Sequence, residues 1–168
     1  MRFDLSSAAV MALAVASALT TAWWMDQAGL RGRAHASTPA VATPATGSPG
    51  QVLKAPDGHY WAEAEIEGRA VRVMVDTGAS VVVLTRVDAA RLGFRLEAAD
   101  FSGSVLTASG PVRAAPVELK AVAVAGARVA AVEALVVEAG LPHSLLGMSY
   151  LGRLSSFSAT PSGLTLRP

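Results

Sequence analysis

An Asp-Thr-Gly tripeptide between two apolar runs constrains this chain more than any other feature of its sequence. Residues 73–75 (VMV) lead into Asp76-Thr77-Gly78, and residues 81–84 (VVVL) follow closely. Apolar, β-branched runs on both sides predict two strands joined by a tight loop. A carboxylate is costly in such surroundings unless it is hydrogen-bonded or takes part in chemistry. The motif therefore predicts a β-structure built around one functional aspartate.

The chemistry that fits such an aspartate needs two carboxylates. When two of them lie about 3 Å apart they share a proton and their pKa values separate, so that one serves as base and the other as acid. This pair can hydrolyse a peptide bond. The tripeptide at Asp76 occurs once, and Asp57-Gly58 lacks the middle hydroxyl residue. The second carboxylate must then come from a second chain, most simply in a two-fold symmetric dimer.

The two neighbours of Asp76 suit a support role. The Gly78 amide can donate to the carboxylate at close range, and the Thr77 hydroxyl can brace the loop. The alternative is an ordinary turn aspartate, because Asp and Gly favour turns for conformational reasons alone. The apolar runs on both sides favour the functional interpretation.

Composition excludes several other classes of protein. The formal net charge is only +1, which predicts no nucleic-acid partner. There is no cysteine, so disulfides and thiolate chemistry are excluded. The histidines (His35, His59 and His143) are not spaced as metal ligands. We expect no metal and no cofactor.

The N-terminal region predicts a membrane anchor. Residues 5–25 form 21 residues without a charge and end in Trp23 and Trp24, which favour the headgroup region. A cleaved signal peptide is the competing interpretation, because residues 34–36 (AHA) resemble a cleavage site. We favour a retained anchor over residues 1–33, and the flanking charges leave its orientation open.

A linker and one folded domain follow. Residues 34–50 (AHASTPAVATPATGSPG) are dominated by Pro, Ala, Thr, Ser and Gly and predict a semi-extended tether without a core. The folded domain is expected to occupy residues 51–168.

Within that domain, alternating apolar residues predict mostly strands. Residues 60–66 and 71–75 alternate with period two around Gly68, which predicts a hairpin that delivers Asp76. Thr85 and Asp88 form a capping pair ahead of a short helix that ends at Gly93.

The remainder of the domain predicts more strands and one further helix. Strands are expected over residues 103–137, with turns at residues 109–111 and 125–127. Residues 144–151 predict a strand that runs into a second short helix, and residues 157–166 a final hairpin.

These motifs together resemble a known family. Residues 71–84 (VRVMVDTGASVVVL) are similar to the active-site region of retropepsin-like (clan AA) aspartic proteases, closest to bacterial membrane-anchored members. Residues 105–110 (VLTASG) resemble the family's flap, and residues 144–151 (SLLGMSYL) its second hallmark, an apolar-apolar-Gly triplet that opens the C-terminal helix. The likeness extends over residues 58–166 in the family's order.

The resemblance implies an all-β fold, a small closed barrel-like acid-protease protomer with one or two short helices, which forms a homodimer. Asp76 of each protomer would then be catalytic. Thr77, Gly78, Ala79 and Ser80 would support the active-site loop. A substrate-binding flap would comprise Thr107, Ala108, Ser109 and Gly110.

We therefore expect an aspartic endopeptidase acting on peptide or protein substrates at the bacterial inner membrane, single-pass, with a periplasmic protease domain. The alternative is a non-catalytic dimeric binding module of the same fold, tethered to the membrane. Two features depart from the family pattern: the flap has fewer glycines than retroviral flaps, and Ala79 lacks the hydroxyl that pepsin-like enzymes carry there.

Overall fold

The structure, a computed structural model, describes residues 43–107 and 110–168. The anchor expected at residues 5–25 lies outside these ranges, as do the possible cleavage site at residues 34–36 and two flap residues, Ala108 and Ser109. Among the helices that the structure describes, none is long and apolar enough to cross a membrane.

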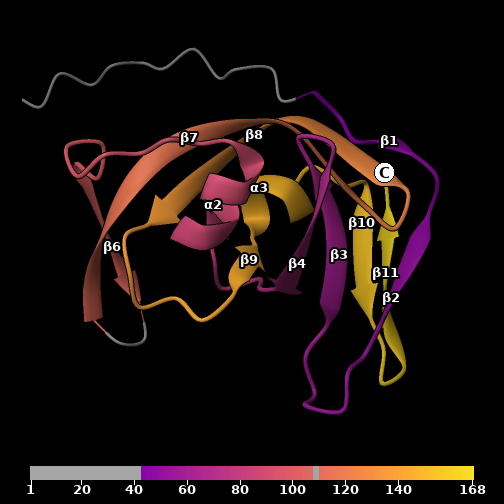
Figure 1. The fold of residues 1–168 in the computed structure, drawn as a ribbon. Coiled ribbons are helices and arrows are strands. Elements are labelled where there is room, and N and C mark those ends of the chain that lie inside the picture. The colour runs from indigo at the N-terminus through magenta and orange to yellow at the C-terminus, as the bar shows by residue number, and fades with distance from the viewer. Residues whose placement is uncertain (1–42, 108–109) are drawn as a thin grey trace, which may run out of the picture. The chain divides into compact units, whose positions relative to one another are not determined.

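The described chain is built mainly of strands (Figure 1). In chain order the elements are β1 (Thr46–Gly47), β2 (Gly50–Leu53), β3 (Trp61–Ile66), β4 (Arg69–Val75), β5 (Val82–Leu84), α2 (Arg86–Leu92), β6 (Gly103–Thr107), β7 (Gly110–Val124), β8 (Ala127–Val137), β9 (Ser144–Leu146), α3 (Met148–Leu151), β10 (Ser156–Ala159) and β11 (Gly163–Arg167). The described domain consists mostly of strands with two short helices, as the sequence predicts.

A closed barrel forms because the long strand β7 pairs on two sides. The larger sheet has the order β1-β8-β5-β9-β4-β3-β7-β6, and β8 also pairs with β7. This additional pairing runs from Ala114↔Val137 to Val124↔Ala127 and joins the two ends of the sheet. Closure removes most free strand edges, and the inward side chains fill the interior.

The hairpin β3–β4 follows its sequence pattern. Ala62, Ala64 and Ile66 are buried while the intervening glutamates are exposed, as a period-two strand requires. Trp61 pairs with Met74, so the register carries β4 to its end at Val75, directly before Asp76.

Helix α2 begins and ends where the sequence predicts. The Thr85 side chain accepts a hydrogen bond from the Asp88 amide, and Gly93 adopts a left-handed conformation at φ 101°. These are standard caps that satisfy the end groups of a helix. Ala89 and Leu92 face the core.

The C-terminal strands form a second, three-stranded sheet with the order β10-β11-β2. The predicted final hairpin is therefore confirmed, and β2 adds its third strand.

Ordered structure begins earlier than the predicted boundary at residue 51. Strand β1 pairs Thr46 with Arg128 and Gly47 with Ala127, and Ala45 packs against the core. A polar, Pro-rich composition predicts a free linker, but backbone hydrogen bonds to β8 need no apolar side chains. The expected linker of residues 34–50 therefore overlaps the folded unit.

Tyr150 of helix α3 is expected to make the stability of the fold depend on pH in the alkaline range. Its side chain is fully buried, and its hydroxyl donates to the Ala127 carbonyl at 2.9 Å. Burial raises the pKa of this phenol above its usual value of about 10, since the charged form is disfavoured. Because the folded state then holds its proton to higher pH than the unfolded state, stability is expected to be complete below about pH 10 and to fall above it.

Urea unfolding at pH 7 to 11 tests this expectation. The Tyr150→Phe variant should lose about 1 kcal/mol at pH 7 with the hydrogen bond, and its stability should decline less above pH 10 than that of the parent protein. Tyr60→Phe is the matched control, because that hydroxyl also donates to a carbonyl, that of Thr160, but from a partly exposed ring. An equally steep decline in the Tyr150 variant would contradict the assignment.

Candidate active site

Asp76 lies on a short loop that begins exactly where β4 ends. Its amide donates to the Leu146 carbonyl at 3.1 Å, and its carbonyl accepts from the Ala79 amide at 3.3 Å. The Gly78 amide donates to Asp76 Oδ1 at 2.8 Å, as the sequence predicts. A backbone donor to a carboxylate oxygen fixes its orientation without a flexible side chain.

The loop presents its motif outward. The Asp76 side chain is partly exposed, and Thr77, Gly78 and Ser80 are exposed. Within the described part of the chain, the Thr77 hydroxyl has no hydrogen-bond partner, so its predicted bracing role is not seen in one chain. The carboxylate is therefore accessible, and the motif forms a surface that a second loop can approach.

The second sequence motif, residues 144–151, holds the loop at Asp76 in place through backbone contacts. Strand β9 pairs in parallel with β4, with Val75 opposite Leu146, which brings Gly147 under the loop. The Met148 amide donates to the Ala79 carbonyl at 2.8 Å. A Cβ at position 147 would lie 2.1 Å from the Val81 carbonyl oxygen and 2.7 Å from that of Ala79. Glycine is required here because the two backbones touch.

Two serines also fix the site, and sequence reasoning did not single them out for this role. Ser149 Oγ accepts from the Val82 amide at 2.9 Å and donates to the Glu133 carbonyl at 2.7 Å. Ser144, fully buried, accepts from the Thr85 amide and donates to Asp88 at 2.6 Å. Their partners are 16 to 67 residues away in sequence, so no local pattern marks them.

Of the expected flap, the structure describes Thr107, which ends β6, and Gly110, which begins β7. Thr107 pairs with Gly110, and the Thr107 hydroxyl donates to the Gly110 carbonyl at 2.8 Å. Leu106, the residue before Thr107, is 85% exposed. In Figure 1 the end of β6 and the loop that follows β4 lie on the same, lower side of the view.

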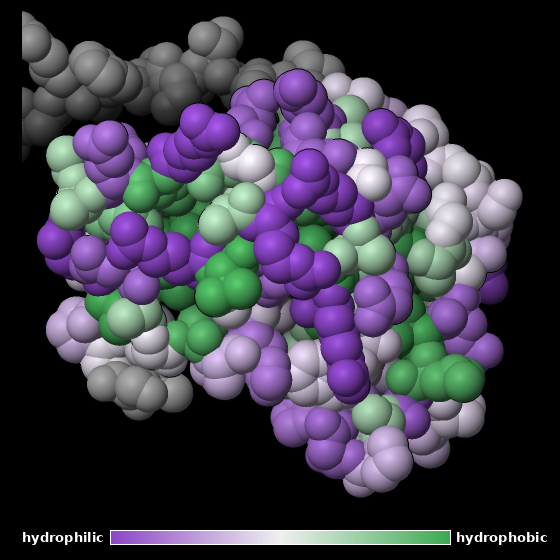
Figure 2. Space-filling view, in the orientation of Figure 1, coloured by the Kyte–Doolittle hydropathy of each residue, from purple (hydrophilic) through white to green (hydrophobic). Residues whose placement is uncertain are grey.

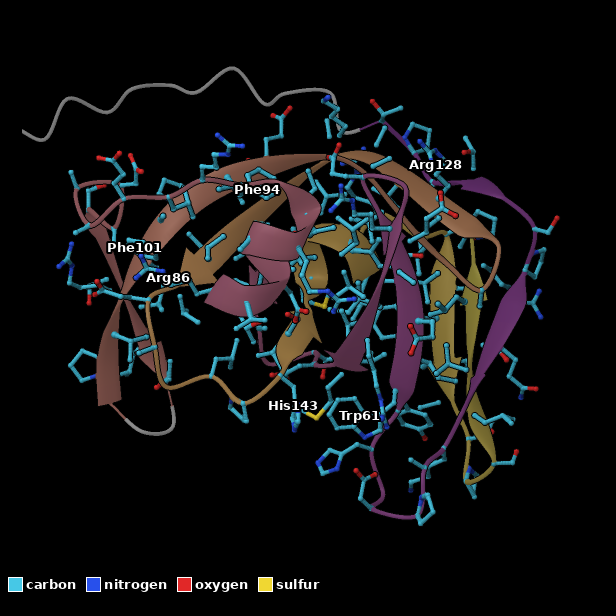
Figure 3. All side chains as sticks on the ribbon, viewed as in Figure 1. Trp61, Arg86, Phe94, Phe101, Arg128 and His143 are labelled. Atoms are coloured by element: carbon cyan, nitrogen blue, oxygen red, sulfur yellow. The ribbon has the colours of Figure 1, made fainter. Side chains whose placement is uncertain are left out.

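A cluster of Trp61, His143 and Arg72 lies near the end of β4, where Trp61 pairs with Met74. Trp61 stacks edge-on with His143 at a centroid distance of 4.8 Å, and the Arg72 guanidinium lies 4.7 Å from the Trp61 ring centroid. Figure 3 shows Trp61 and His143 side by side at the lower end of the barrel. The Trp61 indole donates to Asp57 at 2.8 Å. Hydrogen bonds from the His59 amide and from that indole lower the pKa of the Asp57 carboxyl.

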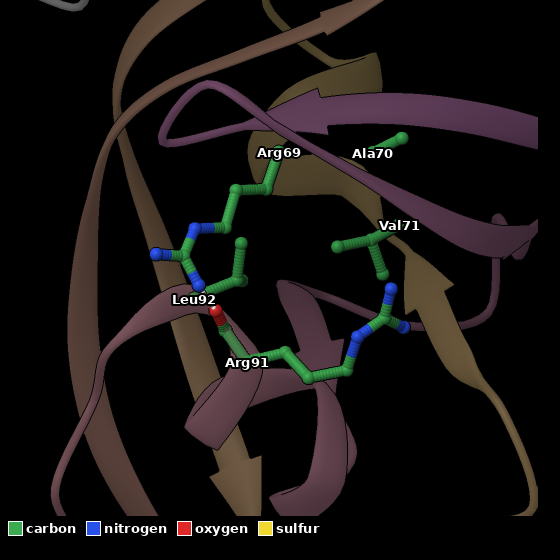
Figure 4. A pocket seen from close by; sticks show the side chains of 5 residues that line it. All are labelled: Arg69, Ala70, Val71, Arg91 and Leu92. Carbon is green, nitrogen blue, oxygen red and sulfur yellow. Dashed lines mark hydrogen bonds between the residues drawn. The ribbon is translucent and has the colours of Figure 1, made fainter.

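The rest of the described surface is mixed in character. Polar side chains cover much of the face in Figure 2, and apolar residues appear between them in small patches. A pocket lined by Arg69 and Arg91 (Figure 4) lies at the start of β4, opposite the end that carries Asp76. In the described ranges no three acidic, His or Cys side chains gather as a metal site.

Comparison with known proteins identifies the family. The model of the gag-polyprotein putative aspartyl protease family matches residues 62–153, which include the loop at Asp76, the flap hairpin and Gly147. The chain belongs to the retropepsin-like aspartic proteases. A crystal structure of a retropepsin-like aspartic protease from Rickettsia conorii superposes with a TM-score of 0.65 and 34% identity, covering 73% of this chain and 92% of that one.

Three further proteins are similar to the chain in fold or in sequence. The inhibitor-bound EIAV protease shares the fold, with a TM-score of 0.51 and 21% identity over 62% of this chain and 96% of that one. An uncharacterised protein of Rickettsia prowazekii is 38% identical, covering 63% of this chain and 46% of its own length. An uncharacterised protein from the cobV 5′ region of Sinorhizobium is 36% identical, covering 77% of this chain and 58% of its own length. The chain thus spans about half the length of these two relatives.

Proposed function

We propose that this retropepsin-like chain is an aspartic endopeptidase whose active site forms from Asp76 of two protomers. The observation that carries the proposal is the fixed carboxylate: Asp76 Oδ1 is held by the Gly78 amide, on a loop fastened by Gly147, with its motif exposed. One carboxylate cannot serve as acid and base at once, and the tripeptide occurs once.

In the proposed reaction one Asp76 carboxylate takes a proton from a water molecule while the other, protonated, donates to the carbonyl oxygen of the peptide bond. The water oxygen bonds to the carbonyl carbon and gives a tetrahedral diol. Proton transfer to the amide nitrogen then breaks the C–N bond and leaves a free acid and a free amine. The pair ends with the one proton that it had at the start.

The proposed substrate is an extended peptide. The proposal is supported by the end of β6, which lies on the same side of the view in Figure 1 as the loop that follows β4, because a strand end there suits a chain bound as an added strand. Alternate side chains of that peptide would then face the protein.

We further propose that residues 5–25 anchor the enzyme in the bacterial inner membrane, with the protease domain in the periplasm. The support is the uncharged 21-residue run that ends in two tryptophans. Anchoring confines protomers to a surface and raises their effective concentration, which favours dimerisation.

Subunit mixing tests the two-chain site. Wild-type protein and the Asp76→Asn variant are combined in equal amounts, exchanged through a mild denaturant, and assayed on a mixed peptide pool. If only wild-type pairs are active, random pairing should leave about a quarter of the rate of an equal total amount of wild-type protein. A rate of one half would mean that each chain acts alone, and absence of cleavage by wild type would refute the protease assignment.

A further inference from the structure

We infer that residues 43–50, here called the strap, are a positioning element of the active site and not a passive linker. The strap contacts β8 and Arg153, and both of these contact helix α3. Helix α3 in turn contacts the loop that carries Asp76. The inference rests on the proposed function for its activity readout, but a second readout, amide exchange, is independent of catalysis.

The strap fits tightly against the turn between β7 and β8. Gly47 pairs with Ala127, and the Ser48 amide donates to the Gly126 carbonyl at 3.2 Å. A Cβ at Gly47 would lie 2.0 Å from the Gly126 oxygen, and one at Gly50 would lie 1.6 Å from the Ala125 oxygen. Two glycines at backbone contact show that this segment is fitted to the turn.

Arg153 links the strap to β8 through hydrogen bonds. Its guanidinium donates to the Thr43 carbonyl from Nε at 3.0 Å and also from Nη2. The same group donates through Nη1 to the carbonyls of Ala130 and Ala131, at 2.6 and 2.9 Å. The Ala45 amide returns a hydrogen bond to the Arg153 carbonyl at 3.3 Å. One side chain therefore joins the strap to β8.

The residues that contact the strap also contact helix α3. The Arg153 amide donates to the Tyr150 carbonyl, directly after the helix. The Tyr150 hydroxyl donates to the carbonyl of Ala127, the residue that pairs with Gly47. The strap and α3 thus share β8 and Arg153 as supports.

At its other end, α3 holds the active-site loop. The Met148 amide binds the Ala79 carbonyl, and Ser149 Oγ receives the Val82 amide. Helix α3 has only four residues, too few to be stable without outside contacts. Its position therefore depends on the supports that the strap shares, and loosening the strap should loosen the loop.

The test uses the full chain with the strap detached by one substitution. Gly47→Val places a side chain against the Gly126 oxygen, about 30 residues from Asp76 in sequence and on a different element. We expect kcat to fall about tenfold, the factor that corresponds to the loss of about one hydrogen bond. Exchange of the Met148 and Val82 amides should accelerate by a similar factor. The control is Gly68→Val, which also has positive φ but has nothing within 4 Å of its Cβ.

A second variant detaches the strap without touching a glycine. Arg153→Gln should reproduce both effects, and the double variant with Gly47→Val should be no worse than either alone, because both remove the same support. Arg167→Gln, which removes an equal charge from an exposed position, is the control.

Two results overturn the inference. The first is unchanged exchange at Met148 and Val82 in both variants, and the second is additive loss in the double variant. Failure of the proposed function is separately visible: the wild-type chain would then cleave nothing, while the exchange measurement would still report whether the strap supports the loop.

Discussion

Replacing Asp76 by Asn is expected to abolish peptide cleavage while the fold stays intact. Asn keeps an oxygen that can accept from the Gly78 amide, but it can neither take nor give the proton that the reaction moves. The rate should fall by at least about 10⁴-fold, as for other residues that handle the transferred proton. The measurement is cleavage of a mixed peptide pool by equal amounts of the purified proteins, with unfolding midpoints compared in urea.

Glu65→Gln is the matched control for this variant, because it removes one exposed carboxylate from β3. It should cleave at the wild-type rate. Equal cleavage by wild type and the Asp76 variant would assign the activity to another residue or to a contaminant. If further purification then removed the cleavage, the chain would be better described by the alternative interpretation, a retropepsin-fold binding module without catalysis.

Local patterns in the sequence predict several elements well. The alternation before and after Gly68 gives hairpin β3–β4, and the Thr85–Asp88 pair with Gly93 gives both ends of α2. In each case the cause lies within a few residues: side-chain alternation, or a cap that satisfies the nearest backbone groups. The Gly78 contact to Asp76 is equally local and is confirmed.

Features that depend on residues far away in the sequence cannot be predicted from such local patterns. The parallel pairing of β4 with β9 joins Val73 to Ser144, and only this register explains why Gly147 must lack a side chain. Ser144 and Arg153 look ordinary in sequence, because their partners come from other parts of the chain. Residues 43–50 are predicted as a linker for the same reason. Their composition is that of a linker, but Gly47 and Gly50 allow close backbone contact with the turn between β7 and β8.

Gly147 is the position outside the carboxylate where a small change should have the largest effect. Its φ of −96° and ψ of −170° are open to any residue, so Gly147→Ala introduces no backbone strain of its own. The added methyl group, however, would meet the Val81 oxygen at 2.1 Å, and something must shift. Displacement of the loop by about 1 Å is expected to lower kcat/KM about 100-fold, and overpacking should cost about 3 kcal/mol of stability.

Gly103→Ala separates this clash from the general effect of adding a methyl group. Its Cβ would lie 3.2 Å from the Ala114 oxygen at the edge of the barrel, so both stability and activity should change little. Unfolding in urea and peptide cleavage are measured for both variants at a temperature where each is folded. If Gly147→Ala matched the wild-type protein in both measurements, the loop at Asp76 would not be held by contact with Gly147. The glycine at this position would then need another explanation.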